Sequence, residues 1–465
     1  MTAINQTSKG LRVLVVSSKP PEYSGNLGGG VVKALRNAGC NVEYLSLIPS
    51  ERKNDFPIYS ILKQEPQKTS DRLSEAMAGP GLKYVKKVLK PFVHLSRNIM
   101  YRFSHKRKVA AFSAKAGFIY PDESAPPIDT DSLLNQLPAS AGYDLIITIF
   151  WQRMLNSTSL RALYDRFKVP VYLYAVDMAP VSGGCFYFNS CVRYKSGCGK
   201  CPCLLSDDPD DRSHANYITK ASNYSRSLIY YIGNSWMIER AVASRLFEAE
   251  RVLNISLIID ETIFYPERSI SVRQSLGFPE DKDIVLLVRS SNATRKGGDI
   301  IVRAAEYIKT HLPAEYLSRI CWVTIGFGSL HKQLAKTGAY VVNHGVVNQD
   351  KLVSLYREAS LFLNPSTDDA GPSMVNQSIM CGTPVVSFNL GTAVDVIENG
   401  ISGFKTDDIS PEGFYRTLEK AIRSLIEGTN PSIRETTRAT ALRHNTSAVF
   451  ASRLLGHYST VCSTR

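Results

Sequence analysis

The chain has 465 residues, 44% of them hydrophobic and 21% charged, which is long enough for two domains with full cores and excludes a disordered protein. Its formal net charge of +13 predicts anionic partners, namely nucleotide diphosphates, an anionic membrane surface or nucleic acid. No apolar run reaches ~18 residues, so we expect no membrane-spanning helix. The first ten residues, MTAINQTSKG, lack the order of a signal peptide, and we expect a cytoplasmic location.

The first predicted unit is a strand over residues 11–18, a glycine-rich loop, a helix over 31–37 and a strand over 40–45. Gly28 and Gly29 in that loop would let the backbone approach a ligand at a helix N-terminus. The loop lacks the GxGxxG order of a dinucleotide fingerprint, so on its own it is a weak signal.

A basic insertion over residues ~50–125 interrupts the α/β alternation. Between residues 76 and 121 there is no Asp or Glu, and Lys and Arg recur among apolar residues at roughly helical spacing. Such a segment suits an anionic membrane surface, at ~1 kcal/mol per Lys or Arg near it. The alternative is a solvated helical pair packed on the first domain. Nucleic-acid binding is not predicted, because no recognition motif accompanies the charge.

Strands over 143–150 and 170–175, joined by a helix over 157–167, lead into a cysteine-rich insertion over 183–204. Its spacing is C-x5-C-x6-C-x2-C, and the residues are Cys185, Cys191, Cys198 and Cys201. Four thiols within so short a segment, ending in a CxxC pair, predict a structural zinc site. Free thiols in a loop and an iron–sulfur cluster are the alternatives.

The second half opens with a strand over 283–288, after a strand over 229–232 and a helix over 237–246. Three cations follow that strand and precede a helix over 299–310: Arg289, Arg295 and Lys296. Cations in a turn before a helix N-terminus can clamp a diphosphate, since Arg makes bidentate contacts and Lys a point-charge contact. The alternative is a solvated basic turn.

Residues 364–387 follow a predicted apolar strand over 359–363. That strand, a turn with Asp368 and Asp369, and a helix N-terminus meet at one point. We expect Pro372 in the first turn of that helix and a parallel strand over 385–388. The free N–H groups there would face a crevice at the sheet edge and suit an anionic or sugar ligand; they belong to Gly371, Ser373 and Met374. The alternative is a capped loop in an ordinary Rossmann-like domain.

The remaining predicted elements are a strand over 321–325, helices over 351–358, 393–398 and 414–425, a hairpin-like turn over 400–404, and a helical tail over 431–458.

Three of these stretches, together with residues 253–266, resemble the retaining glycosyltransferases of family 4. Asp369-x7-Gln377 followed by CGTPVVSF is similar to that family's donor-site signature, in which both positions are Glu. The RKG turn ending at Gly297 and the run LNISLIIDETIFYP also match, and DMAPVSGGC…GCGKCP resembles a cysteine-bearing subgroup associated with exopolysaccharide and capsule synthesis. Val176 and Phe186 stand where many members of that subgroup have His.

The resemblance implies an α/β protein of the GT-B fold, with two Rossmann-like doubly wound domains facing a cleft. Residues 1–266 would form the acceptor domain, 267–440 the nucleotide-sugar donor domain, and 441–465 a helix that crosses back.

The resemblance also implies roles for the residues. Lys296 and either Arg295 or Arg289 would grip the donor diphosphate, without a divalent metal. Asp368 or Asp369 would orient sugar hydroxyls and Gln377 the ribose, and Gly28 and Gly29 would touch donor phosphate or acceptor.

The implied reaction transfers a sugar with retention of configuration from a UDP- or GDP-sugar to a saccharide or lipid-linked saccharide at the inner membrane face, in polysaccharide synthesis. The altered positions Val176, Phe186 and Gln377 also fit a catalytically degenerate, sugar-nucleotide-binding partner subunit. An epimerase or phosphorylase on the same fold is a third alternative, for which we find no acid–base or cofactor-binding residues.

Overall fold

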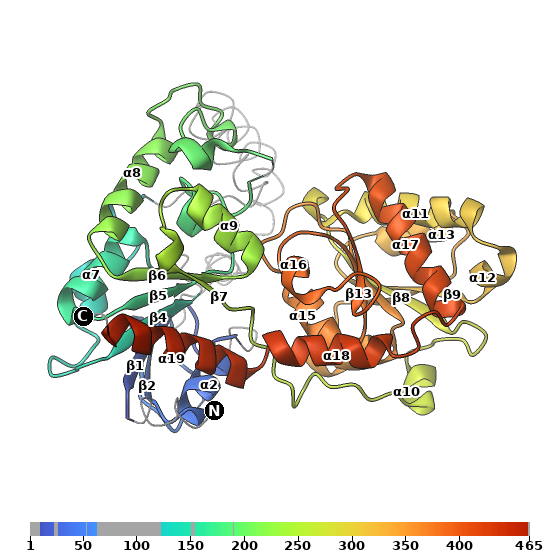
Figure 1. Cartoon of the computed structure of the whole chain (residues 1–465), viewed down its shortest axis with the longest axis horizontal. Coiled ribbons are helices and arrows are strands. Elements are labelled where there is room, and N and C mark those ends of the chain that lie inside the picture. The colour runs from blue at the N-terminus through green and yellow to red at the C-terminus, as the bar shows by residue number, and fades with distance from the viewer. Residues whose placement is uncertain are drawn as a thin grey trace, which may run out of the picture.

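The structure is a computed structural model and describes residues 10–22, 27–52, 54–62, 122–149, 154–188 and 190–463. Most of the predicted basic insertion therefore lies outside the described residues. Two α/β domains stand side by side, the first coloured blue to green and the second yellow to orange (Figure 1).

The first domain is built on a sheet of seven parallel strands. Its strand order is β3-β2-β1-β4-β5-β6-β7. The strands are β1 (Arg12–Ser17), β2 (Asn41–Ser46), β3 (Ile58–Ser60), β4 (Leu145–Ile149), β5 (Val171–Tyr174), β6 (Ile229–Gly233) and β7 (Val252–Asn254). In the centre, Val13 lies opposite Val42 of β2 and Leu145 of β4, so the strand order reverses direction at β1. The short edge strands β3 and β7 were not predicted.

Helices cover both faces of this sheet, because successive strand residues point to opposite sides. Val13 and Val15 pack toward α2 and the C-terminal helix α19 (Ser447–Ser463), whereas Leu14 and Val16 pack toward α7 and α8. The helices of this domain are α2 (Leu27–Asn37), α6 (Thr130–Leu134), α7 (Ser157–Phe167), α8 (Arg212–Ser225) and α9 (Ser235–Ala243). Helix α7 has the predicted bounds, and Asn156 caps it by accepting from Ser159 N at 3.0 Å.

The second domain repeats the design with six parallel strands in the order β10-β9-β8-β11-β12-β13. The strands are β8 (Ile284–Ser290), β9 (Ile320–Gly326), β10 (Val341–Gly345), β11 (Leu361–Asn364), β12 (Val385–Phe388) and β13 (Gly403–Thr406). The prediction of a hairpin-like turn over 400–404 was wrong. The chain does turn there, with Gly400 N donating to Gly403 O at 2.7 Å, but it then adds β13 as a parallel edge strand beside β12.

The second sheet is also covered on both faces, by α11 and α17 on one side and by α14 and α15 on the other. Its helices are α10 (Ile270–Ser275), α11 (Gly298–His311), α12 (Ala314–Ser318), α13 (Leu330–Lys336), α14 (Gln349–Glu358), α15 (Ser373–Met380), α16 (Ala393–Val396), α17 (Pro411–Ile426) and α18 (Ile433–His444).

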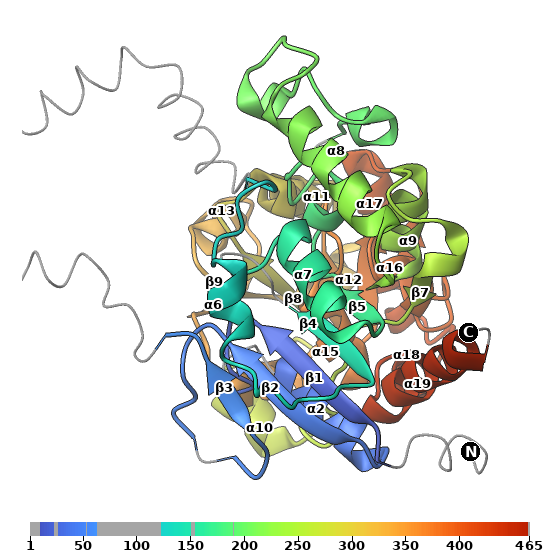
Figure 2. The ribbon, with the colours of Figure 1, turned by 90° about the vertical axis from the view of Figure 1, so that its left-hand side faces the viewer.

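The last two helices belong to different domains. Helix α18 packs on α15 of the second domain, while α19 returns to the first domain and lies beside α2 (Figures 1 and 2). The return passes next to the first crossing, because Ile259 N donates to Asn445 O at 2.8 Å. The chain therefore crosses between the domains twice, at adjacent points.

Candidate functional site

A cleft of about 690 Å³ lies between the two domains. It opens at the carboxyl ends of β5, β8 and β11, the edge at which parallel sheets bind ligands. The first domain lines it with Leu27, Val176, Asp177, Phe186, Tyr187 and residues 257–259. The second lines it with Arg289, Ser291, Ala293, Arg295, Lys296, residues 362–366, Asp369, residues 371–374 and Gln377.

The three predicted cations all reach this cleft. Arg289 lies in the exposed penultimate position of β8, and the 3-10 helix η5 (Thr294–Lys296) carries Arg295 and Lys296. The side chains of Arg295 and Lys296 are only 22% and 17% exposed. Burial lowers the pKa of Lys296 from its ordinary value, and the neighbouring Asp369 carboxylate partly offsets that shift.

Gly297 brings the two predicted second-domain motifs together. Its φ of +67° is left-handed, and a Cβ there would stand 2.2 Å from Pro365 O, so a side chain would push the turns apart. Thr367 N donates to Arg295 O at 2.9 Å across the same contact. The turn after β8 and the turn after β11 thus form a single wall of the cleft.

The two predicted carboxylates separate. Asp369 lines the cleft, where its side chain accepts from Lys296 and lies 3.6 Å from Arg295 Nη1. Asp368 is buried outside the cleft lining, and its backbone O accepts from Arg295 at 3.1 Å. Of the two alternatives, Asp369 is therefore the carboxylate that can meet a ligand in the cleft.

The N-terminus of α15 also faces the cleft. Gly371, Ser373 and Met374 line it, and no side chain caps the helix. Pro372 occupies the N-cap position, one residue before the first turn in which we expected it. Gln377 lines the cleft one turn further on, and its Oε1 accepts from Tyr356 OH at 3.4 Å.

The structure does not bring the predicted glycines to the cations. Helix α2 begins at Leu27, earlier than predicted, so Gly28 and Gly29 lie inside its first turn. Gly28 is buried, and Gly29 lines a separate hollow with Lys33 and Arg36. Leu27 is the residue of this turn that lines the cleft. The helix starts just before the run of three glycines, and this explains the difference.

Two residues that sequence reasoning missed lie on the first-domain wall. The Tyr187 ring stacks on the guanidinium of Arg295, with Arg295 Cζ 3.5 Å from the ring centroid. Asp177 lies three residues after the end of β5, is 6% exposed, and its Oδ1 accepts from Ala179 N at 2.9 Å. Position in the DMAP motif could have identified Asp177. No sequence signal pairs Tyr187 with Arg295.

The four predicted metal ligands line one small pocket of about 20 Å³, outside the interdomain cleft. Burial, and to a lesser extent the neighbouring thiols of Cys198, Cys201 and Cys191, raises the pKa of Cys185 to about 12. Within the described ranges, no group of three or more His, Cys, Asp or Glu side chains is arranged so that it could hold a metal ion.

Of the helices that the structure describes, none combines the length and apolar character needed to cross a membrane. The predicted membrane-binding surface of the basic insertion falls on residues outside the described part, apart from its margins.

Parts of the chain are similar in sequence to known proteins. Residues 282–424 match the family model described as "Glycosyl transferases group 1". The D-inositol 3-phosphate glycosyltransferase of Acidothermus cellulolyticus is 29% identical over 214 residues, 42% of this chain and 47% of that protein. The enzyme of that name from Thermobispora bispora is 27% identical over 184 residues, 37% of this chain and 42% of that protein. The chain thus spans less than half the length of these two relatives.

Solved structures match over nearly the whole chain. HepE of Anabaena, in complex with UDP and glucose, has a TM-score of 0.56 at 16% identity, with 98% of this chain and all of that one covered. Sucrose-phosphate synthase of Thermosynechococcus elongatus has a TM-score of 0.59 at 13% identity and a glycosyltransferase of Rickettsia africae 0.60 at 12%, each covering 98% of this chain and 100% of the other. The predicted GT-B fold is confirmed.

Proposed function

We propose that the protein is a glycosyltransferase that moves a sugar from a nucleotide-diphosphate sugar to a hydroxyl of a saccharide. One observation carries the proposal: Arg289, Arg295, Lys296 and the uncapped N-terminus of α15 face the same cleft between two Rossmann-like domains. Negative charge develops on the leaving diphosphate during such a transfer, and preorganised donors in a partly buried site are worth more than in water.

The proposed chemistry is electrostatic. Arg295 and Arg289 contact the phosphate oxygens through planar forks, Lys296 supplies a point charge, and the N–H groups of α15 add donors along the helix axis. Because the chain's own cations neutralise the leaving group, the proposal assigns no step to a divalent ion.

Asp369 has two roles in this proposal. Before the donor binds, it neutralises Lys296 and Arg295. The diphosphate then replaces Asp369 as the partner of these cations, and the released carboxylate accepts hydrogen bonds from sugar hydroxyls. Gln377, one turn into α15 on the same wall, accepts from a ribose hydroxyl through its amide oxygen.

The acceptor then enters from the first-domain wall, between Tyr187, Asp177 and the apolar pair Val176 and Phe186. We further propose retention of configuration and a lipid-linked saccharide as the acceptor in polysaccharide synthesis, at the inner membrane face. The basic insertion supports the membrane surface, and the resemblance of the donor motifs supports retention.

Calorimetric titration of the full chain with UDP, GDP and ADP tests the donor site. HepE is similar in fold and binds UDP, so UDP is the first nucleotide to titrate. We expect micromolar affinity for one nucleotide, about 8 kcal/mol. Lys296→Ala should abolish measurable binding, whereas Lys332→Ala, an exposed cation on α13, should leave it unchanged.

Absence of binding by all three nucleotides at millimolar concentration would overturn the proposal. A different outcome is a protein that binds a nucleotide but releases none from any sugar donor when saccharide acceptors are present. That result would favour the catalytically degenerate partner subunit. The substitutions at Val176, Phe186 and Gln377 are the observations that favour that second function.

A further inference from the structure

The loop between the 3-10 helix η1 (Ala179–Val181) and α8 has little regular structure but many constraints. We call residues 182–188 and 190–206 the cysteine loop. Its regular parts are the short 3-10 helices η2 (Arg193–Ser196) and η3 (Pro202–Leu204). Cys185, Cys191, Cys198 and Cys201 all line its pocket of about 20 Å³, beside the stacked rings of Phe188 and Tyr194.

The CxxC turn has an unusual backbone. Four successive residues, from Gly197 to Lys200, have left-handed φ values of 95°, 62°, 83° and 46°. Cys198 and Lys200 are not glycines, and left-handed backbone at such residues persists only where the surroundings hold it. Gly199 admits no side chain, because a Cβ there would stand 2.1 Å from Pro209 O.

Helix α8 holds both ends of the cysteine loop. At the C-terminal end, Cys201 N donates to Asp211 Oδ2 at 2.7 Å and Gly199 N to Ser213 Oγ at 3.0 Å. At the N-terminal end, Asn216 Nδ2 donates to Gly183 O at 3.0 Å.

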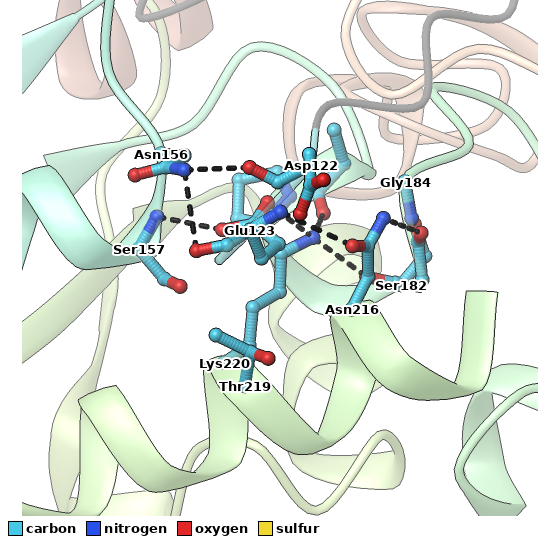
Figure 3. A network of polar contacts seen from close by, with 12 residues as sticks. Asp122, Glu123, Asn156, Ser157, Ser182, Gly184, Asn216, Thr219 and Lys220 are labelled. Carbon is cyan, nitrogen blue, oxygen red and sulfur yellow. Dashed lines mark hydrogen bonds and ion pairs between the residues drawn. The ribbon is translucent and has the colours of Figure 1, made fainter. Parts of the chain in front are cut away.

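Lys220 completes this support from one turn further along α8. Its Nζ donates to Ala179 O at 2.6 Å and Ser182 O at 2.7 Å, and it pairs with Glu123 Oε1 at 3.3 Å (Figure 3). Lys220 and Glu123 are both fully buried. The buried Lys220 ammonium therefore bonds to two backbone carbonyls and to Glu123, and this fixes the N-terminal end of the cysteine loop. The four cysteines are thus partly preorganised before any metal binds.

Two features of the surroundings would stabilise a zinc–thiolate cluster once it has formed. Gly183 N donates to Cys198 Sγ at 3.2 Å, and hydrogen bonding to a charged form favours it. Residues 185–203 contain Arg193, Lys195 and Lys200 and no Asp or Glu. A divalent ion with four thiolates carries a net charge of about −2, which this positive segment complements.

We propose that Cys185, Cys191, Cys198 and Cys201 bind one structural zinc ion. A four-thiolate set is the closed, tetrahedral kind of site, which leaves no position for substrate. Among the described residues no group of side chains is already arranged to hold a metal ion. Zinc binding therefore requires the four cysteine side chains to rotate so that their sulfurs point into the pocket that these residues line. Each cysteine has one staggered side-chain torsion with which to do so.

The site has a consequence for the cleft. Phe186 and Tyr187, which line the first-domain wall, lie between the first two zinc ligands in the sequence. Metal binding at the cysteines would therefore fix the loop that places Tyr187 on Arg295. This inference does not depend on the proposed transfer reaction.

The test is metal analysis of the purified full chain. We expect about one zinc per chain, and charge-transfer absorption typical of cobalt–thiolate bonds after exchange with Co²⁺. Cys198→Ser and Cys201→Ser should lower the zinc content at least about fivefold, whereas Cys203→Ser and Cys462→Ser should keep it.

The wild-type measurement stands even if a variant fails to fold. Less than about 0.2 zinc per chain, with no cobalt–thiolate absorption in reduced protein incubated with Co²⁺, would overturn the proposal. An intact mass that shows disulfides among these cysteines in protein kept under reducing conditions would do the same, as would full zinc content in Cys198→Ser.

Discussion

The two domains share one strand order and differ in the segments that leave their strands. Counted along the chain within each domain, the strands lie in the order 3-2-1-4-5-6 across both sheets. The first domain adds β7 as a seventh strand at the edge. In the second domain, short turns after β8 and β11 deliver the cations and Asp369. In the first domain, much of the wall comes instead from the long segment after β5, in which the cysteine loop supplies Phe186 and Tyr187.

This difference separates two ways of building a binding surface. The second-domain wall is held mainly by contacts between two turns, with Gly297 against Pro365 and Thr367 against Arg295. The first-domain wall depends on a buried ion pair, on α8 and on Tyr187 reaching across the cleft. We therefore expect changes to the first wall to affect stability and changes to the second to affect ligand binding.

The largest expected effect is on the first wall. Lys220→Met would leave Glu123 buried without its partner, which typically costs about 3–5 kcal/mol. Chemical denaturation of the full chain, followed by fluorescence, measures that loss of unfolding free energy.

The double variant Lys220→Met/Glu123→Gln provides the control, because it removes both charges and should recover part of the stability. A loss below about 1 kcal/mol in the single variant would show that the pair does not hold the loop.

The next effect concerns the second wall. Asp369→Asn removes the carboxylate that neutralises Lys296 and Arg295, so UDP without a sugar should bind roughly tenfold more tightly, about 1.4 kcal/mol. Sugar transfer should fall in the same variant, since the sugar hydroxyls lose an acceptor. Asp350→Asn, an exposed change on α14, should alter neither measurement. Weaker UDP binding by Asp369→Asn would mean that Asp369 does not compete with phosphate.

A smaller effect lies where the walls meet. Tyr187→Ala removes the ring that covers Arg295, a contact of about 0.5–2 kcal/mol, and should weaken donor binding several-fold. Tyr187→Phe keeps the ring and should bind like the wild type. Equal losses in both variants would point to the hydroxyl rather than the ring. Calorimetric titration with the nucleotide that binds the wild type measures the affinity of the wild type and of both variants.

The smallest effect near neutral pH is the pH dependence of that binding. The pKa of Lys296 is lowered, chiefly by burial, so its charge is complete at low pH and is lost as pH rises through a value below that of an ordinary lysine. Nucleotide affinity should therefore decline as the pH rises through that value. Lys296→Arg should flatten this decline, because arginine stays protonated there. An unchanged slope in Lys296→Arg would assign the dependence to another group.

The fold and the second-domain wall of the cleft could be predicted from the sequence because both depend on local residue patterns. The apolar runs at β1, β4 and β8 indicate buried parallel strands, and the cations and Asp369 each come after such a strand. The start of α2 and the strand β13 were misjudged, since glycines at Gly28 and Gly403 resemble loop positions and only packing places them in regular elements.

The other wall could not be read in the same way. Tyr187 meets Arg295, and Lys220 meets Glu123, across large separations in sequence and without any periodic signal. These contacts depend on how the loops are arranged in the folded protein, and that arrangement cannot be derived from a single sequence. Only the spacing of the cysteines marked this region as structured.

The double crossing between the domains constrains how the cleft can open. Asn445 on the return crossing bonds to both Leu257 and Ile259 on the outward crossing, at 2.8 Å in each case. Two adjacent connections resist a twist of one domain against the other more than a single connection would. The position of Tyr187 over Arg295 is therefore held by the paired chain connections as well as by the ring contact itself.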